Sequence, residues 1–188
     1  IKHLSTEGFQ LVTALADSEM SVVDDLRKQN IEVKVLPSAR SICFENIYGE
    51  DTNERKQRVT AKADPFTVES LQDVNARIYH LGSLLADDFS LEVIKSLAGK
   101  GLLSLDVQGY LREVRDEEVL AVDWTEKEEA LKYIHILKAN EYEMEVLTEC
   151  VDPYDAALKL ADWGVKEVLL TLGDKGSLIY VDGRFYEI

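Results

Sequence analysis

The sequence predicts a doubly wound α/β domain, with a mostly parallel sheet, helices on both faces and a small β-hairpin lid. Short apolar runs alternate along the chain with segments of helical periodicity. The runs at 102–107 and 168–172 fit parallel strands that are buried on both faces. An alternating stretch interrupts this pattern, so we assign residues 1–40 and 64–188 to the main domain and residues 41–63 to the lid.

The first elements follow a strand–helix–strand order. Residues 9–16 form a short apolar run that predicts a buried strand. Apolar residues at helical spacing predict a helix over 18–30, and Ser18 is the expected N-cap. Residues 31–37 alternate and end at a proline, which predicts a strand with a defined stop.

Residues 41–65 carry two alternating stretches around a polar turn at 49–53. Phe44 and Tyr48 lie on one face of the first stretch, and charged residues lie on the other. This pattern predicts a β-hairpin that projects from the main body. A surface hairpin without a function would give the same pattern.

The remainder returns to alternating strands and helices. Thr125 with Glu128, and Asn140 with Glu143, have the spacing of a capping box, and Pro153 suits a first helical turn. We expect strands at 77–83, 102–107, 133–138 and 165–173, helices at 87–101, 125–134, 141–148 and 152–164, and two antiparallel strands within 177–188.

The composition excludes several classes of partner. The 188 residues are 46% hydrophobic and 30% charged, and the net charge is −15. Nucleic acids and anionic membrane surfaces need a basic footprint, so neither is an expected partner, and the acidity suits a solubilising surface. Cys43 and Cys150 lie far apart, which argues against a disulfide framework or a zinc site. We therefore expect a reducing cytoplasm, and no apolar run approaches the roughly 18 residues of a membrane span.

Polar residues follow the ends of the predicted parallel strands. Open α/β sheets bind ligands at the carboxyl ends of their strands, so loops at these ends are candidate parts of one site. The loops are Gly82-Ser83, 106–112, Asn140-x-x-Glu143 and 171–177. Because loops after strands are usually polar and exposed, this convergence alone supports a site only modestly.

Each loop also has a structural interpretation. Asn140 and Glu143 fit a helix cap, although a carboxylate and an amide in a first helical turn also suit hydrated Mg²⁺ and phosphate. Residues 171–176, TLGDKG, fit a hairpin turn, or a glycine loop that lets a ligand approach the backbone, with Lys175 as a charge. Asp106, Gln108 and Arg112 follow a strand, and Arg112 suits either a phosphate or a loop salt bridge.

The order and spacing of these segments resemble the ribokinase-like (PfkB) family of carbohydrate and nucleoside kinases. The stretches that carry the resemblance are SICFENIYGEDTNERKQ, YHLGSLLADDFS, LDVQGYLREV, LKANEYEMEVLT and VKEVLLTLGDKGSLIYVDGRFYEI. The resemblance implies transfer of the ATP γ-phosphoryl group, with Mg²⁺, to a hydroxymethyl oxygen of a sugar. A nucleoside kinase of the same family and a non-catalytic relative that senses a sugar or nucleotide are the alternatives.

The resemblance also implies roles for individual residues. Asn140 and Glu143 match the motif that organises Mg²⁺ and phosphates, and the resemblance also implies a homodimer through the lid. The remaining implied residues are Thr171, Gly173 and Gly176 for the nucleotide, and Ser83, Arg112, Asp106 and Phe44 for the substrate.

The chain departs from the family pattern at three places. The family's first strand with its Gly-Gly motif would precede Ile1, and its Gly-Ala-Gly-Asp loop with the catalytic base would follow Ile188. ALADSEMS at 14–21 replaces a usual glycine turn. We therefore expect an interior portion of a longer kinase, with negligible activity by itself. A dinucleotide-binding oxidoreductase is disfavoured because G-x-G-x-x-G is absent.

Overall fold

The computed structural model describes residues 8–48 and 55–188, and the chain divides into two compact units. Unit 1 is Ile1–Pro65 with Asp116–Val119, and unit 2 is Phe66–Arg115 with Leu120–Ile188. Unit 1 thus combines the lid segment with residues 1–40, which the sequence analysis assigned to the main domain. The expected turn at 49–53 lies outside the described residues.

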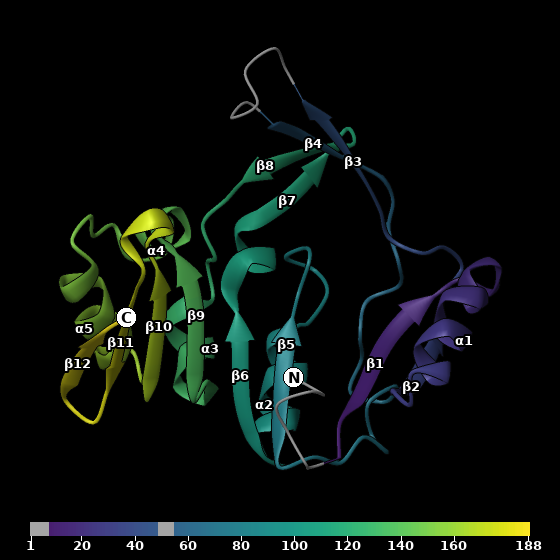
Figure 1. The fold of residues 1–188 in the computed structure, drawn as a ribbon, viewed down its shortest axis with the longest axis horizontal. Coiled ribbons are helices and arrows are strands. Elements are labelled where there is room, and N and C mark those ends of the chain that lie inside the picture. The colour runs from purple at the N-terminus through teal and green to yellow at the C-terminus, as the bar shows by residue number, and fades with distance from the viewer. Residues whose placement is uncertain (1–7, 49–54) are drawn as a thin grey trace. The chain divides into compact units, whose positions relative to one another are not determined.

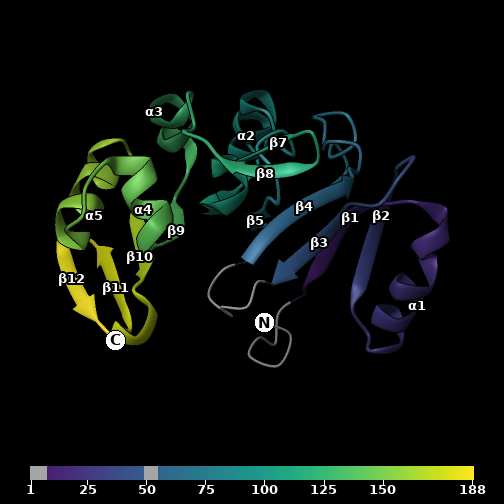
Figure 2. The ribbon, with the colours of Figure 1, turned by 90° about the horizontal axis from the view of Figure 1, so that it is seen from above.

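Unit 1 begins with a parallel pair of strands, as the sequence predicts. The elements are β1 (Gln10–Leu15), the 3-10 turn η1 (Asp17–Glu19), α1 (Met20–Lys28) and β2 (Glu32–Pro37). β1 pairs with β2 from Gln10↔Glu32 to Leu15↔Pro37, and α1 lies beside this pair with Val23 fully buried (Figure 2). The prediction that Ser18 caps the helix is wrong, because Asp17–Glu19 form a turn closed by Glu19 N donating to Ala16 O.

The predicted hairpin is present as β3 (Cys43–Tyr48) and β4 (Arg55–Ala61), which pair antiparallel. A further strand, β8 (Glu118–Ala121), begins in unit 1 and pairs with β4 at Arg58↔Glu118. The Arg58 side chain forms ion pairs with Glu45 and Glu117. This strand is not predicted from the sequence, because four residues are too few for a recognisable alternation.

Unit 2 contains a six-stranded sheet in the order β12-β11-β10-β9-β6-β5. The four strands β10, β9, β6 and β5 are parallel neighbours, whereas β11 and β12 add an antiparallel hairpin. The strands are β5 (Ile78–Gly82), β6 (Leu102–Asp106), β9 (Ile136–Asn140), β10 (Glu167–Thr171), β11 (Ser177–Val181) and β12 (Arg184–Glu187). The mostly parallel sheet predicted from the alternating pattern is confirmed.

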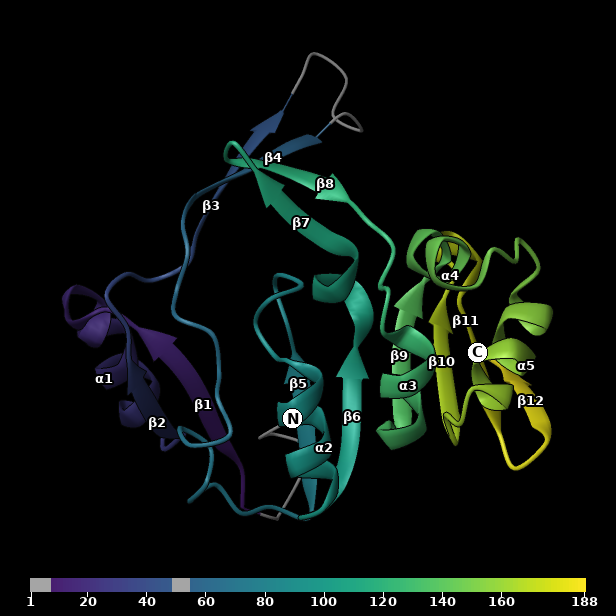
Figure 3. The ribbon, with the colours of Figure 1, turned by 180° about the vertical axis from the view of Figure 1, so that it is seen from behind.

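Helices pack against this sheet and complete its core. They are α2 (Leu91–Ala98), α3 (Lys127–Ala130), α4 (Glu141–Thr148) and α5 (Pro153–Asp162), and Figure 3 shows α2 and α3 in front of the sheet. The apolar residues at alternate positions of β6, β9 and β10 are fully buried: Leu103, Leu105, Leu137, Ala139, Val168 and Leu170. The residues between them are less buried. Burial therefore alternates along β6, β9 and β10, whereas strands buried on both faces were predicted at 102–107 and 168–172.

The helix caps differ in how well they follow the sequence. Pro153 lies in the first turn of α5, as expected, and Asp152, which was not predicted as a cap, is its N-cap. The Thr125–Glu128 box is wrong, because α3 begins at Lys127 and is only four residues long. A local motif therefore marks a helix start reliably only where a longer amphipathic segment follows it.

Among the described residues, no helix is both long and apolar enough to cross a membrane.

Candidate functional site

The predicted strand-end loops of unit 2 meet at the carboxyl edge of its sheet. The arrowheads of β5, β6, β9 and β10 in Figure 1 point to the same edge. The register pairs Gly82 with Asp106, Asp106 with Lys138, and Asn140 with Thr171. Residues from four separate sequence segments therefore line one edge, as the fold class requires.

Asn140 and Glu143 form the capping box that their spacing predicts. Asn140 Oδ1 accepts a 2.8 Å hydrogen bond from Glu143 N, and Glu143 Oε2 accepts one of 2.8 Å from Asn140 N. Glu143 is only 8% exposed, and the structure gives its other oxygen, Oε1, no hydrogen-bond partner among the described residues. One carboxylate oxygen is thus committed to the cap, and the other is available to a ligand.

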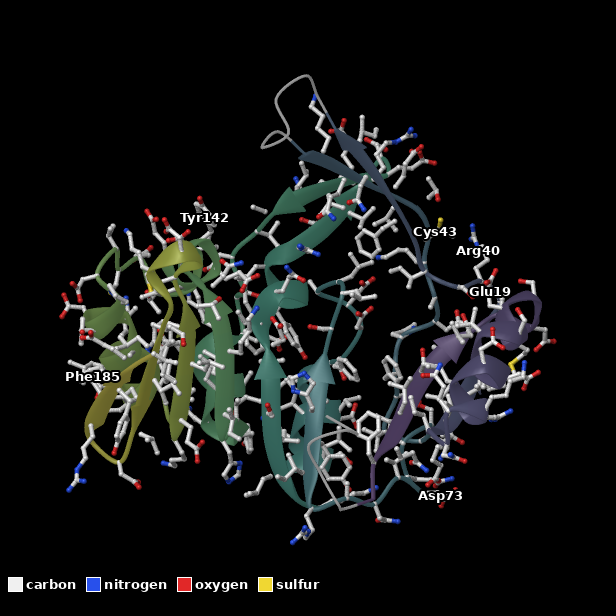
Figure 4. All side chains as sticks on the ribbon, in the orientation of Figure 1. Glu19, Arg40, Cys43, Asp73, Tyr142 and Phe185 are labelled. Atoms are coloured by element: carbon white, nitrogen blue, oxygen red, sulfur yellow. The ribbon has the colours of Figure 1, made fainter. Side chains whose placement is uncertain are left out.

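The same first turn has an exposed surface. Tyr142 (labelled in Figure 4) is 73% exposed at the start of α4. The N-terminus of α4 carries the positive end of the helix dipole, which favours anionic groups such as phosphate. The carboxylate of Glu143 at this position instead suits a cation. The two properties together suit a cation–phosphate pair.

Lys138 is a central residue of this edge that the sequence analysis missed. Its Nζ lies 3.2 Å from Asp106 Oδ2 and 3.7 Å from Glu143 Oε2. The side chains of Lys138 and Asp106 are each 30% exposed, so these ion pairs are partly shielded from water. The available signal was a lone lysine inside the otherwise apolar run ILKA, two residues before Asn140.

The loops after β5 and β6 touch directly through Ser83 and Gly109. A Cβ added to Gly109 would lie 2.5 Å from the carbonyl carbon of Ser83 and 2.6 Å from its oxygen. Tyr110 fixes this loop, since its hydroxyl donates to Phe89 O and its ring stacks on Trp124 at 4.1 Å. Burial raises the pKa of the Tyr110 phenol well above its ordinary value, so the hydroxyl remains a donor.

The hydroxyl of Ser83 is buried without a hydrogen-bond partner among the described residues. Replacing Ser83 with alanine removes this unsatisfied group, and we expect the free energy of unfolding to rise by about 1 kcal/mol. Urea unfolding measures this change. Ser104→Ala is the matched control, because Ser104 Oγ contacts His80 Nδ1 at 3.1 Å and its removal should not stabilise. A loss of stability in Ser83→Ala would show that the hydroxyl has a partner.

The loop TLGDKG connects two antiparallel strands through a tight turn, and it lies at the carboxyl edge of the sheet. Residues Gly173–Lys175 form the 3-10 turn η4 between the antiparallel strands β10 and β11. Gly173 and Gly176 have φ values of +61° and +88°, which favour glycine. A Cβ on Gly176 would clash with the backbone oxygen of Ile188, so this glycine also permits close chain packing. Thr171 Oγ1 donates to Ala139 O at 3.5 Å.

The remaining predicted residues are distributed over both units. Asp106 joins Lys138 and also accepts from Gln108 N at 3.3 Å, which caps the 3-10 turn η2 (Val107–Leu111). Arg112 begins β7 (Arg112–Arg115), and its backbone oxygen accepts from Ala86 N. Phe44 lies in β3 of unit 1, where it is half-buried opposite Val59. Asp106, Asn140 and Glu143 are therefore brought together, whereas Phe44 belongs to another unit.

Comparison with known proteins gives related kinases, although no family model matches the chain. A cytidine kinase of Thermococcus kodakarensis is 27% identical over 164 residues, which are 82% of this chain and 53% of that protein. A sulfate complex of a pyrophosphate-dependent kinase in the ribokinase family matches with a TM-score of 0.90 and 31% identity, over 97% of this chain and 65% of the other.

A pyrophosphate-dependent kinase in the ribokinase family, complexed with a pyrophosphate analog and myo-inositol, has a TM-score of 0.87 and 30% identity. That match covers 97% of this chain and 64% of the other. The chain thus spans about half the length of the curated relative, and less than two thirds of these solved chains.

Proposed function

Because the chain is ribokinase-like in sequence and fold along 97% of its length, we propose that the whole protein is a sugar or nucleoside kinase. The observation that carries this proposal is the Asn140–Glu143 pair at the carboxyl edge of the sheet, beside Asp106 and Lys138. A kinase of this class positions two reactants and stabilises the negative charge on the transferred phosphoryl group. An edge that combines a helix N-terminus, an ammonium group and a carboxylate suits that task.

The phosphoryl donor in this proposal is ATP with Mg²⁺. Among the described residues, no group of three His, Cys, Asp or Glu side chains is placed to cage a metal. Magnesium commonly keeps several waters and binds through one or two carboxylates plus substrate phosphates, so Glu143 with its uncommitted oxygen fits this mode. When bound, the ion would neutralise charge on the donor phosphates.

The chain's own residues would orient the donor. Glu143 would hold the hydrated metal through Oε1, and Asn140 would fix Glu143 through the cap. The backbone of the TLGDKG loop would lie against the nucleotide, at Thr171, Gly173 and Gly176. Pyrophosphate is a second candidate donor, because the two ribokinase-family structures described above, at 31% and 30% identity, are of pyrophosphate-dependent kinases.

The acceptor in this proposal is a small polyhydroxylated molecule. The related proteins include a cytidine kinase and a kinase complexed with myo-inositol, which supports a sugar-like or nucleoside hydroxyl. We assign Asp106, Arg112 and Phe44 to the acceptor side. Ser83 would contribute by shaping the adjacent loop, because it is only 4% exposed.

The wider setting of the protein is also a proposal. A homodimer contact through the lid hairpin is part of this proposal, and Ile47 on β3, which is 43% exposed, would lie at that contact. Cys43 and Cys150 are both free thiols, which supports a reducing cytoplasm.

A donor-by-acceptor screen on the full-length protein tests the proposed function. ATP or pyrophosphate, each with Mg²⁺, would be mixed with ribose, fructose, myo-inositol or cytidine, and phosphorylated products followed by phosphorus NMR. We expect turnover with at least one pair and none with residues 1–188 alone. Binding of an acceptor without turnover would instead support a sensing relative, and absence of both would contradict the proposal.

A further inference from the structure

We propose that Lys138 is a positioning residue of the donor site, which contacts Oε2 of the Glu143 carboxylate, leaves Oε1 for the donor's metal ion and offsets the combined negative charge of Glu143 and Asp106. This inference rests on the proposed kinase function. Lys138 and Asp106 are register partners on adjacent parallel strands, and their side chains meet at 3.2 Å. The same ammonium group lies 3.7 Å from Glu143 Oε2.

The two carboxylates belong to different loops, and each already has a structural role. Asp106 caps η2 through Gln108 N, and Glu143 caps α4 through Asn140 N. The ammonium group of Lys138 therefore ties the start of the loop after β6 to the start of α4. Because Lys138 and Asn140 both contact Oε2, Oε1 is the oxygen left for a ligand.

The charges at this edge explain why a positioned ammonium group matters. Two carboxylates beside one partly buried lysine repel each other once the lysine is removed. An uncompensated pair attracts a divalent cation more strongly, but it repels donor phosphates. Lys138 thus offsets part of the negative charge of Asp106 and Glu143 at the carboxyl edge of the sheet. As a result, a metal ion binds tightly together with the donor phosphates and weakly by itself.

A metal-binding measurement on the full-length protein tests this role. Mn²⁺ alone is the probe, and electron paramagnetic resonance reports the free ion. We expect Lys138→Met to bind Mn²⁺ on the order of tenfold more tightly than wild type, since a neighbouring charge shifts such equilibria by about 10-fold or more. Lys138→Arg keeps the charge and should restore the wild-type affinity.

A second readout comes from the reaction. In Lys138→Met, we expect the KM for the magnesium-bound donor to rise by roughly tenfold, because the positive charge that balances the donor phosphates is lost. Lys166→Met is the matched control, because this substitution removes the same formal charge. Lys166 immediately precedes β10, at the opposite end of the strand from the candidate site. Its Mn²⁺ affinity and KM should equal those of wild type.

The outcomes separate this inference from the proposed function. An active wild type together with unchanged Mn²⁺ affinity and donor KM in Lys138→Met would overturn the role of Lys138 alone. Wild-type protein without phosphoryl transfer would overturn the proposed function, while the Mn²⁺ titration would still report on Lys138.

If Lys138→Met does not fold, Asp106→Asn replaces it. That variant should weaken Mn²⁺ binding at least about threefold, because one of the two carboxylates that attract the cation is gone, and an unchanged affinity would contradict the proposal.

Discussion

Replacing Gly109 with alanine is expected to lower the free energy of unfolding by about 3 kcal/mol, at the upper end of typical overpacking costs. The added methyl group would approach the Ser83 carbonyl carbon at 2.5 Å and the oxygen at 2.6 Å. Both atoms are backbone, so no side-chain rotation relieves the clash. Tyr110 holds the loop on the other side through Phe89 O and Trp124, so the loop cannot move away without losing those contacts. Urea unfolding monitored by circular dichroism measures the loss.

Gly82→Ala is the matched control, because it lies on the same edge of the sheet. The nearest atom to its added methyl group would be His80 Nε2 at 4.0 Å, which is an ordinary contact. We expect its free energy of unfolding to lie within about 1 kcal/mol of wild type, since alanine also costs less chain entropy than glycine. Equal stabilities of Gly109→Ala and Gly82→Ala would mean that the two strand-end loops are not packed as the structure shows.

The sequence predicted most clearly those features that are encoded within one segment. The Asn140–Glu143 capping box needs only two residues three positions apart and a helix after them, and both are present. The two antiparallel strands predicted within 177–188, which are β11 and β12, are local in the same sense. Alternating strands and helices sufficed for the mostly parallel sheet, because a parallel crossover requires an intervening segment.

The features that the sequence did not predict depend on contacts between distant segments. Lys138 acquires its importance from Asp106, 32 residues earlier, and only the strand register places them together. In the sequence, Gly109 looks like an ordinary loop glycine. Only the structure shows that the Ser83 backbone lies against it. The extra strand β8 is recognisable through its pairing in the sheet, where Glu118 lies opposite Arg58 on β4. Such contacts are fixed by packing, which a local pattern does not encode.

Replacing Glu143 with glutamine in the full-length protein is expected to lower the magnesium-dependent rate by roughly 10²-fold while barely changing stability. The amide oxygen of glutamine still accepts the bond from Asn140 N, so the helix cap is kept. The negative charge that would hold the hydrated metal and pair with Lys138 is lost. Initial rates across a Mg²⁺ titration, together with urea unfolding, measure the two effects separately.

Glu145→Gln makes the same chemical change on the same helix, at an exposed position away from the cap. Its rate and its stability should both match wild type, so any difference from Glu143→Gln reports on position rather than on charge. A normal rate in Glu143→Gln would show that the motif only caps α4. A low rate with an intact fold would show that one carboxylate serves two roles, because Oε2 belongs to the helix cap and Oε1 to the ligand.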